Sequence, residues 1–178
     1  MGLFKPAWMS NNTDKALNAV KKISDQEKLI EIAEWANNED VRVAAVKKIS
    51  SQDKLIYLVV GGYGLRCEAM LMAAVEKLTD QRLLVGIVKN GNFSYNVRMK
   101  AVNELTDHEA LLYLAMREIG DDYCKDYKKL YQALQAVAKE KYEAMFGEPA
   151  KLTMAMTIAM IVGEQHPYEH IHTDQWRS

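Results

Sequence analysis

Residues 19–30 read AVKKISDQEKLI, and residues 45–56 read AVKKISSQDKLI. Two looser copies follow: AVEKLTDQRLLV at residues 74–85 and AVNELTDHEALL at residues 101–112. Successive copies begin 26, 29 and 27 residues apart. Self-similarity at such a period is typical of stacked repeat arrays. The sequence therefore predicts an all-α fold that contains four repeats, each made of two helices.

The composition is that of a globular protein, with 49% hydrophobic and 26% charged residues. A length of 178 residues suits one domain, so we expect residues 1–178 to form a single domain. The net charge is -1, without the basic excess of a dedicated nucleic-acid binder. Two cysteines do not make a disulfide framework. The most apolar run, residues 152–162, is too short to span a bilayer, so we expect a cytoplasmic protein with no membrane segment.

Each copy is predicted to form a helical hairpin. In the second copy the first helix spans about residues 40–49, where Val43, Val46 and Ile49 share one face. The second helix carries a broad apolar face that begins at Leu55. One hairpin alone cannot cover both faces, so neighbouring copies must stack on one another.

The turn inside each hairpin carries residues that favour the start of a helix. We expect the N-caps of the second helices to be Ser24, Ser50, Thr79 and Thr106. Glu27 and Glu109, three residues after such a cap, would complete capping boxes in the first and fourth copies. Arg82 occupies that position in the third copy, so we expect its second helix to start less firmly.

The first helices also carry a recurring motif, VRxxAVxxI at residues 41–49 and VRxxAVxxL at residues 97–105. These short helix pairs resemble HEAT-like repeats of the short bacterial kind, over about residues 13–119. The resemblance implies an α-solenoid whose second helices line a concave face. HEAT repeats usually run longer and carry a proline in their first helix, so a solenoid of the leucine-rich-variant type remains an alternative.

The two ends of the chain do not repeat. We divide the chain into an N-terminal cap segment (1–12), four repeats (13–119), a C-terminal pair of capping helices (120–163) and a tail (164–178). Asn12 or Thr13 should start the first helix, with Trp8 folded over the first repeat. Helical spacing continues to about Met145, where Gly147 is expected to stop the helix, and a second apolar helix should follow at 150–162.

Stacked repeats place equivalent residues in rows, and one row suggests a binding site. Tyr57, Gly86 and Tyr113 occupy the same position in successive second helices. If this position points outward, a notch lies between the two tyrosines. Aromatic rings beside a gap suit a peptide or a small ligand. The candidate groove residues are Glu31, Trp35, Tyr57, Arg82, Tyr113 and Arg117. The alternative is that these are ordinary half-exposed residues without a partner.

No catalytic or cofactor motif is apparent in the sequence. The only candidate metal ligands are His166, His170 and His172 in the tail. Imidazoles near carboxylates can hold zinc or nickel, but Pro167 argues against a continuous helix there, and we expect adventitious metal capture rather than a designed site. We therefore expect neither a resident metal nor a cofactor.

The favoured function is a non-enzymatic scaffold that binds a protein or a peptide on its concave face. The rival is an enzyme or a nucleic-acid module, because some proteins with HEAT-like repeats are DNA glycosylases and others are lyases that attach bilins. Against nucleic acid, the corresponding row carries Glu27, Asp53 and Glu109, which would repel phosphate.

Overall fold

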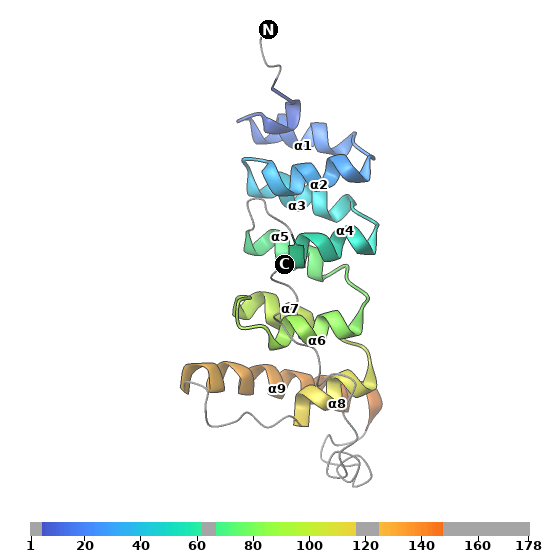
Figure 1. Cartoon of the computed structure of the whole chain (residues 1–178), viewed down its shortest axis with the longest axis vertical. Coiled ribbons are helices and arrows are strands. Elements are labelled where there is room, and N and C mark those ends of the chain that lie inside the picture. Colours follow the sequence, from blue (N-terminus) through green and yellow to red (C-terminus); the bar gives the residue numbers. More distant parts are fainter. Residues whose placement is uncertain (1–4, 62–66, 117–124, 148–178) are drawn as a thin grey trace. The chain divides into compact units, whose positions relative to one another are not determined.

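The computed structural model describes residues 5–61, 67–116 and 125–147, and their regular secondary structure is entirely helical (Figure 1). The elements are η1 (Ala7–Met9), α1 (Thr13–Lys21), α2 (Gln26–Trp35), α3 (Glu39–Lys48), α4 (Gln52–Ile56), η2 (Tyr57–Gly61), α5 (Glu68–Val75), α6 (Gln81–Lys89), α7 (Tyr95–Glu104), α8 (His108–Met116) and α9 (Lys125–Phe146). The all-α prediction is confirmed.

The helices gather into two compact units, the first ending at Leu78 and the second beginning at Thr79. In the first unit α3 lies between α1 and α5 and also packs against α2. In the second unit α6 packs against α7, and both α7 and α8 pack against the long helix α9. The arrangement of four repeats as one single-domain solenoid stays a prediction.

The buried face of the first helices differs slightly from the predicted one. Val46 and Ile49 are fully buried as expected, but Val43 is only half-buried. Val41 and Ala45 are buried in its place. Positions 41, 45 and 49 follow the four-residue spacing of an α-helix more closely than positions 43, 46 and 49 do.

The predicted N-caps of the second helices were wrong by one residue. The actual caps are Asp25, Ser51, Asp80 and Asp107. Asp25 Oδ1 accepts from the backbone N–H groups of Glu27 and Lys28, at 2.9 and 3.4 Å. An aspartate there satisfies free N–H groups and also places a full negative charge at the positive end of the helix dipole.

The expected weak start in the third copy was also wrong. Asp80 Oδ1 accepts from Arg82 and Leu83 N–H groups at 2.9 and 3.1 Å, so Arg82 only contributes its backbone. The weakest of these caps is Ser51, which accepts a single bond of 3.4 Å from Lys54. The side chain at the cap, not the residue three positions later, decides how well the helix starts.

The described part of the N-terminal segment packs on the first helix. Trp8 of η1 is 3% exposed, and η1 packs against α1. Lys28 Nζ of α2 lies 5.4 Å from the centroid of the Trp8 ring, a cation–π contact. Asn12 caps α1 and accepts from Lys15 N–H at 2.9 Å. The indole ring therefore seals the start of the first hairpin.

The long helix α9 ends where the sequence indicates. Its last residue is Phe146, and Gly147 follows with a φ of 70°. The Gly147 N–H donates to the Glu143 carbonyl at 3.0 Å. This is the usual left-handed termination of a helix by glycine. The second capping helix expected at 150–162 lies outside the described residues.

We expect Gly147→Ala to destabilise the protein by about 1 kcal/mol, because a Cβ is disfavoured at positive φ. No atom lies within 4 Å of the position where this Cβ would stand, so the cost is conformational rather than steric. Urea unfolding followed by circular dichroism measures it. Gly91→Ala, at an exposed turn without positive φ, is the control and should change stability by less than about 0.5 kcal/mol. An equal loss of stability in the two variants would contradict the conclusion that the cost at Gly147 comes from its positive φ.

Candidate functional site

Two of the predicted groove residues are large aromatic side chains exposed in the first unit. Trp35 is 49% exposed at the end of α2, and Tyr57 is 37% exposed at the start of η2. An ion pair between Lys54 and Glu27 links the start of α4 to the start of α2. The aromatic residues therefore come from neighbouring elements. We call Trp35 and Tyr57 the aromatic face.

Tyr57 begins a π-helical segment instead of continuing the α-helix of α4. η2 runs from Tyr57 to Gly61, where the other second helices are α-helical throughout. A Cβ at Gly61 would stand 3.4 Å from Cδ2 of the Tyr57 ring. The ring thus lies over the place where Gly61 has no side chain. Local π-helix often occurs at functional sites.

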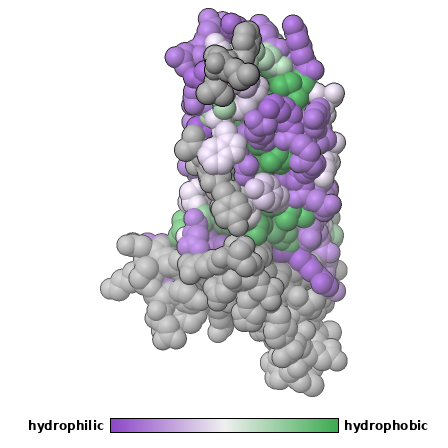
Figure 2. Space-filling model, turned by 45° about the horizontal axis from the view of Figure 1, so that its top comes forward, coloured by the Kyte–Doolittle hydropathy of each residue, from purple (hydrophilic) through white to green (hydrophobic). Residues whose placement is uncertain are grey.

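Charges beside the aromatic face are largely neutralised by local pairs. Lys28 Nζ lies 2.5 Å from Glu31 Oε2, so the predicted groove residue Glu31 is exposed but paired. Such surface pairs contribute little to stability, roughly 0–1 kcal/mol. Figure 2 shows a face on which hydrophilic side chains predominate among the coloured residues, with small separate hydrophobic areas.

The predicted groove residues of the second unit are arranged differently. Tyr113 is only 4% exposed, so the condition set for the notch, that this position points outward, does not hold for Tyr113. Its hydroxyl lies 3.2 Å from Lys89 Nζ, and this ammonium lies 5.5 Å from the ring centroid. Gly86 is buried within α6. Arg82 is exposed, and Arg117 lies outside the described residues.

A row of glutamines, not recognised in the sequence, joins successive turns. Gln26, Gln52 and Gln81 are each the first residue of a second helix. Gln26 Oε1 accepts from Ser50 N–H at 2.9 Å. Gln52 Nε2 donates to the Lys77 carbonyl at 2.8 Å. Each amide thereby satisfies backbone groups in the turn of the next copy.

The third glutamine repeats the same function in the second unit. Gln81 Oε1 accepts from Thr106 and Asp107 N–H groups at 2.8 and 3.0 Å. We call Gln26, Gln52 and Gln81 the glutamine ladder. The recurrence of glutamine at this position of three copies was the sequence signal for it.

Lysines form a second ladder between consecutive first helices. Lys48 Nζ, at the end of α3, donates to the Val20 and Lys21 carbonyls at the end of α1, at 3.0 and 2.6 Å. Lys77 Nζ donates in the same way to the carbonyls of Lys47, at 2.7 Å, and Ile49. An ammonium at a helix C-terminus satisfies free carbonyls and interacts favourably with the helix dipole.

A lysine of α9 caps the last first helix. Lys141 Nζ donates to the carbonyls of Val102, at 3.4 Å, and Asn103 at the end of α7. Burial lowers the pKa of both Lys77 and Lys141, while the Glu104 carboxylate partly opposes this shift at Lys141. We call Lys48, Lys77 and Lys141 the lysine ladder.

The glutamine ladder ends at His108, where the repeats meet α9. His108 holds the position of the glutamines, as the first residue of α8. Its Nε2 lies 2.8 Å from the hydroxyl of Tyr142 on α9. The His108 ring also meets the Phe146 ring edge-on, with centroids 4.7 Å apart. At His108, contacts with the aromatic side chains of α9 therefore take the place of the hydrogen bonds that the glutamines make to the turn of the next copy.

Among the described residues, the reactive side chains do not come together in a catalytic arrangement. Burial raises the pKa of the Cys67 thiol, and the Glu39 carboxylate adds to this shift, so the thiol is not an activated nucleophile. Cys67 is half-buried. Among the described residues, no group of three or more His, Cys, Asp or Glu side chains is placed to hold a metal ion. The tail histidines lie beyond these residues.

Comparison with models of protein families, with curated proteins and with solved structures finds no match to this chain. Within residues 5–61, 67–116 and 125–147, no helix combines the length and the apolar character needed to cross a bilayer.

Proposed function

We propose that this chain is a non-enzymatic cytoplasmic scaffold, built as a HEAT-like α-solenoid of four repeats, that binds a protein or a peptide on the face formed by its second helices. Support for the stacked design comes from the two ladders, since each ties a turn or a helix end to the next copy. Such ties hold the second helices in register, and a rigid surface loses less entropy on binding.

The observation that carries the proposal is the exposure of two large aromatic side chains of the first unit, Trp35 at the end of α2 and Tyr57 at the start of η2. Tryptophan and tyrosine dominate the binding energy of many interfaces, because a large ring buries much apolar area at little conformational cost. Neither ring is required to fill the core of the first unit. A partner that covers them would gain apolar contact and hydrogen bonds to the phenol and indole groups.

Charge on the neighbouring positions favours a polypeptide over nucleic acid. Asp53 is exposed on α4 of the first unit, and Glu109 is exposed on α8 of the second unit. Carboxylates at these positions repel a phosphate backbone. They would instead suit lysine or arginine side chains on a bound peptide.

We expect Trp35→Ala and Tyr57→Ala each to weaken partner binding by roughly 30-fold, the loss typical of a hot-spot aromatic residue. The immobilised full chain would capture partners from an extract of the cells that produce it, and mass spectrometry would quantify them. Binding constants would then be measured for each captured partner.

Tyr95→Ala is the matched control. Tyr95 is 39% exposed, much like Tyr57, but it belongs to α7, a first helix. It should leave capture unchanged. Capture of the same proteins at the same level by the Trp35 and Tyr57 variants, with native circular dichroism, would remove the aromatic face as the binding site.

A further inference from the structure

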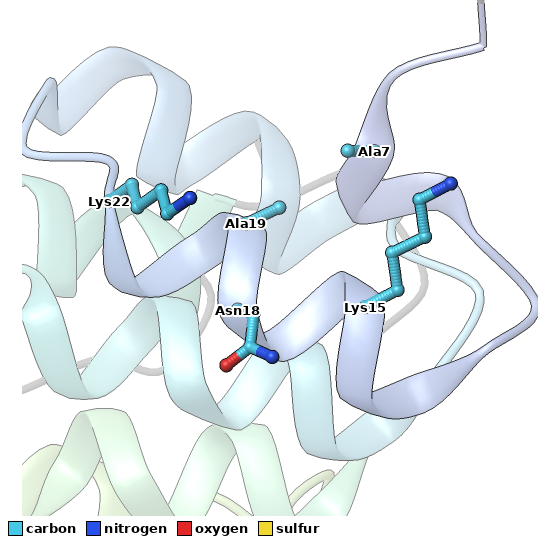
Figure 3. Close-up of a pocket in the computed structure, with 5 residues that line it drawn as sticks. All are labelled: Ala7, Lys15, Asn18, Ala19 and Lys22. Atoms are coloured by element: carbon cyan, nitrogen blue, oxygen red, sulfur yellow. The ribbon is translucent and has the colours of Figure 1, made fainter.

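A hollow of about 520 Å³ lies on α1 beside η1, and its lining includes neither residue of the aromatic face. Its lining residues are Ala7, Lys15, Asn18, Ala19 and Lys22. Figure 3 shows Lys15 and Lys22 toward opposite ends of this hollow, with Ala19 between them and Ala7 facing it from η1. Both lysines are exposed.

The repeat register shows what a lysine at the Lys22 position does. Lys22, Lys48 and Lys77 occupy the same position in the first three copies. Lys48 and Lys77 each donate to two carbonyls at the C-terminal end of the preceding first helix. α1 is the earliest first helix of the described residues, and no hydrogen bond or ion pair of Lys22 Nζ is found among them. Its ammonium is therefore placed to cap a helix that this part of the chain does not supply.

The face of α1 around the hollow also differs from the equivalent faces in later copies. Lys15 replaces Val41 and Met70, which are buried against neighbouring helices. An apolar helix would leave the Lys15 ammonium without compensation. Lys15 and Lys22 stand seven residues apart, so about 10.5 Å, or two helical turns, separates them along one side of α1.

We propose that this hollow binds the C-terminal end of an acidic helix from a partner protein. The last carbonyls of that helix accept from Lys22, as those of α1 accept from Lys48. A carboxylate about two turns earlier on the same helix pairs with Lys15, because Lys48 and Lys77 each join the C-terminal end of their own first helix to that of the preceding one. Ala7 and Ala19 leave room for the approaching backbone.

Three of the four first helices of a second copy are poorer occupants, and α5 is the exception. The ends of α1, α3 and α7 are already capped by Lys48, Lys77 and Lys141 of the same chain. None of these ends can serve a second Lys22 without losing its own lysine. The surface is also separate from the aromatic face, so this inference does not depend on the proposed function.

The test uses the full ¹⁵N-labelled chain and a synthetic alanine-based helical peptide of about 20 residues, long enough to be helical in water. Its C-terminus is amidated, and a glutamate stands two turns before the end. A twin peptide carries glutamine there. We expect the glutamate peptide to shift the backbone amide resonances of residues 15–22 saturably. The glutamine twin should bind about tenfold more weakly, as expected for loss of one charge-assisted hydrogen bond.

Lys22→Ala and Lys15→Ala should each weaken binding of the glutamate peptide about tenfold. Lys47→Ala removes the same charge from another exposed position and should have no effect. Unchanged amide spectra elsewhere show that the variants are folded. Equal binding of the two peptides, or full affinity of Lys22→Ala, would overturn the proposal. So would saturable shifts of the same amides by inorganic phosphate, which would indicate a simple anion site. Self-association abolished by Lys22→Ala in sedimentation would make a second copy the occupant.

Discussion

Replacing Arg98 with alanine is expected to destabilise the second unit by about 3–5 kcal/mol. The Arg98 side chain is 1% exposed, and its Nε donates to the Val88 carbonyl at 2.7 Å. Its guanidinium also lies 6.0 Å from the centroid of the Tyr131 ring on α9. Alanine removes a buried cap from the end of α6, leaves the Val88 carbonyl without this donor, and opens a cavity between α6, α7 and α9.

Urea unfolding followed by circular dichroism measures this loss. Arg42 offers a matched comparison, because its Nε donates to the Ala36 carbonyl at 2.7 Å in the first unit, but the residue is 9% exposed. We expect Arg42→Ala to cost less than Arg98→Ala, since water can partly replace its contacts. Stability of Arg98→Ala within about 0.5 kcal/mol of the parent would show that the buried arginine is not a structural cap.

Replacing Tyr142 with alanine should have an effect of similar size, about 3–5 kcal/mol, typical of a buried aromatic residue. Tyr142 is 1% exposed on α9, and its ring centroid lies 4.9 Å from that of His108 and 5.2 Å from that of Phe146. Loss of the ring removes the contact that docks α9 on the start of α8. Hydrogen exchange of the α8 and α9 amides, together with urea unfolding, measures how far this docking weakens.

Tyr142→Phe separates the ring from its hydroxyl. This variant keeps the packing and loses only the 2.8 Å hydrogen bond to His108, so we expect a cost of about 1 kcal/mol. If Tyr142→Phe lowered the stability as much as Tyr142→Ala does, the hydrogen bond and not the aromatic packing would attach α9.

Much of the secondary structure could be predicted because the copies align on apolar periodicity. The first helix of the second copy was expected at about 40–49 and is found at Glu39–Lys48. The caps could not be predicted as well. Ser24 and Asp25 are both good N-cap residues, and only the backbone path decides which side chain faces the free N–H groups.

The candidate site, too, could be predicted only in part from the sequence. Tyr57 and Tyr113 hold the same position in the repeat, yet one is 37% and the other 4% exposed. The sequence gives no reason for this difference, because it depends on neighbours that do not repeat. η2 interrupts the helix at Tyr57, whereas Tyr113 lies on α8, which packs against both α6 and α9.

The helical hairpins follow from local sequence, since periodic apolar residues and turn signals act over a few residues. The partners of the polar side chains depend instead on how the helices pack. Gln26, Lys48 and Arg98 look like ordinary polar residues in a repeat, and each bonds a backbone group in another element. Such a bond requires a donor and an acceptor within about 3 Å and in line, a condition that packing sets and local sequence does not.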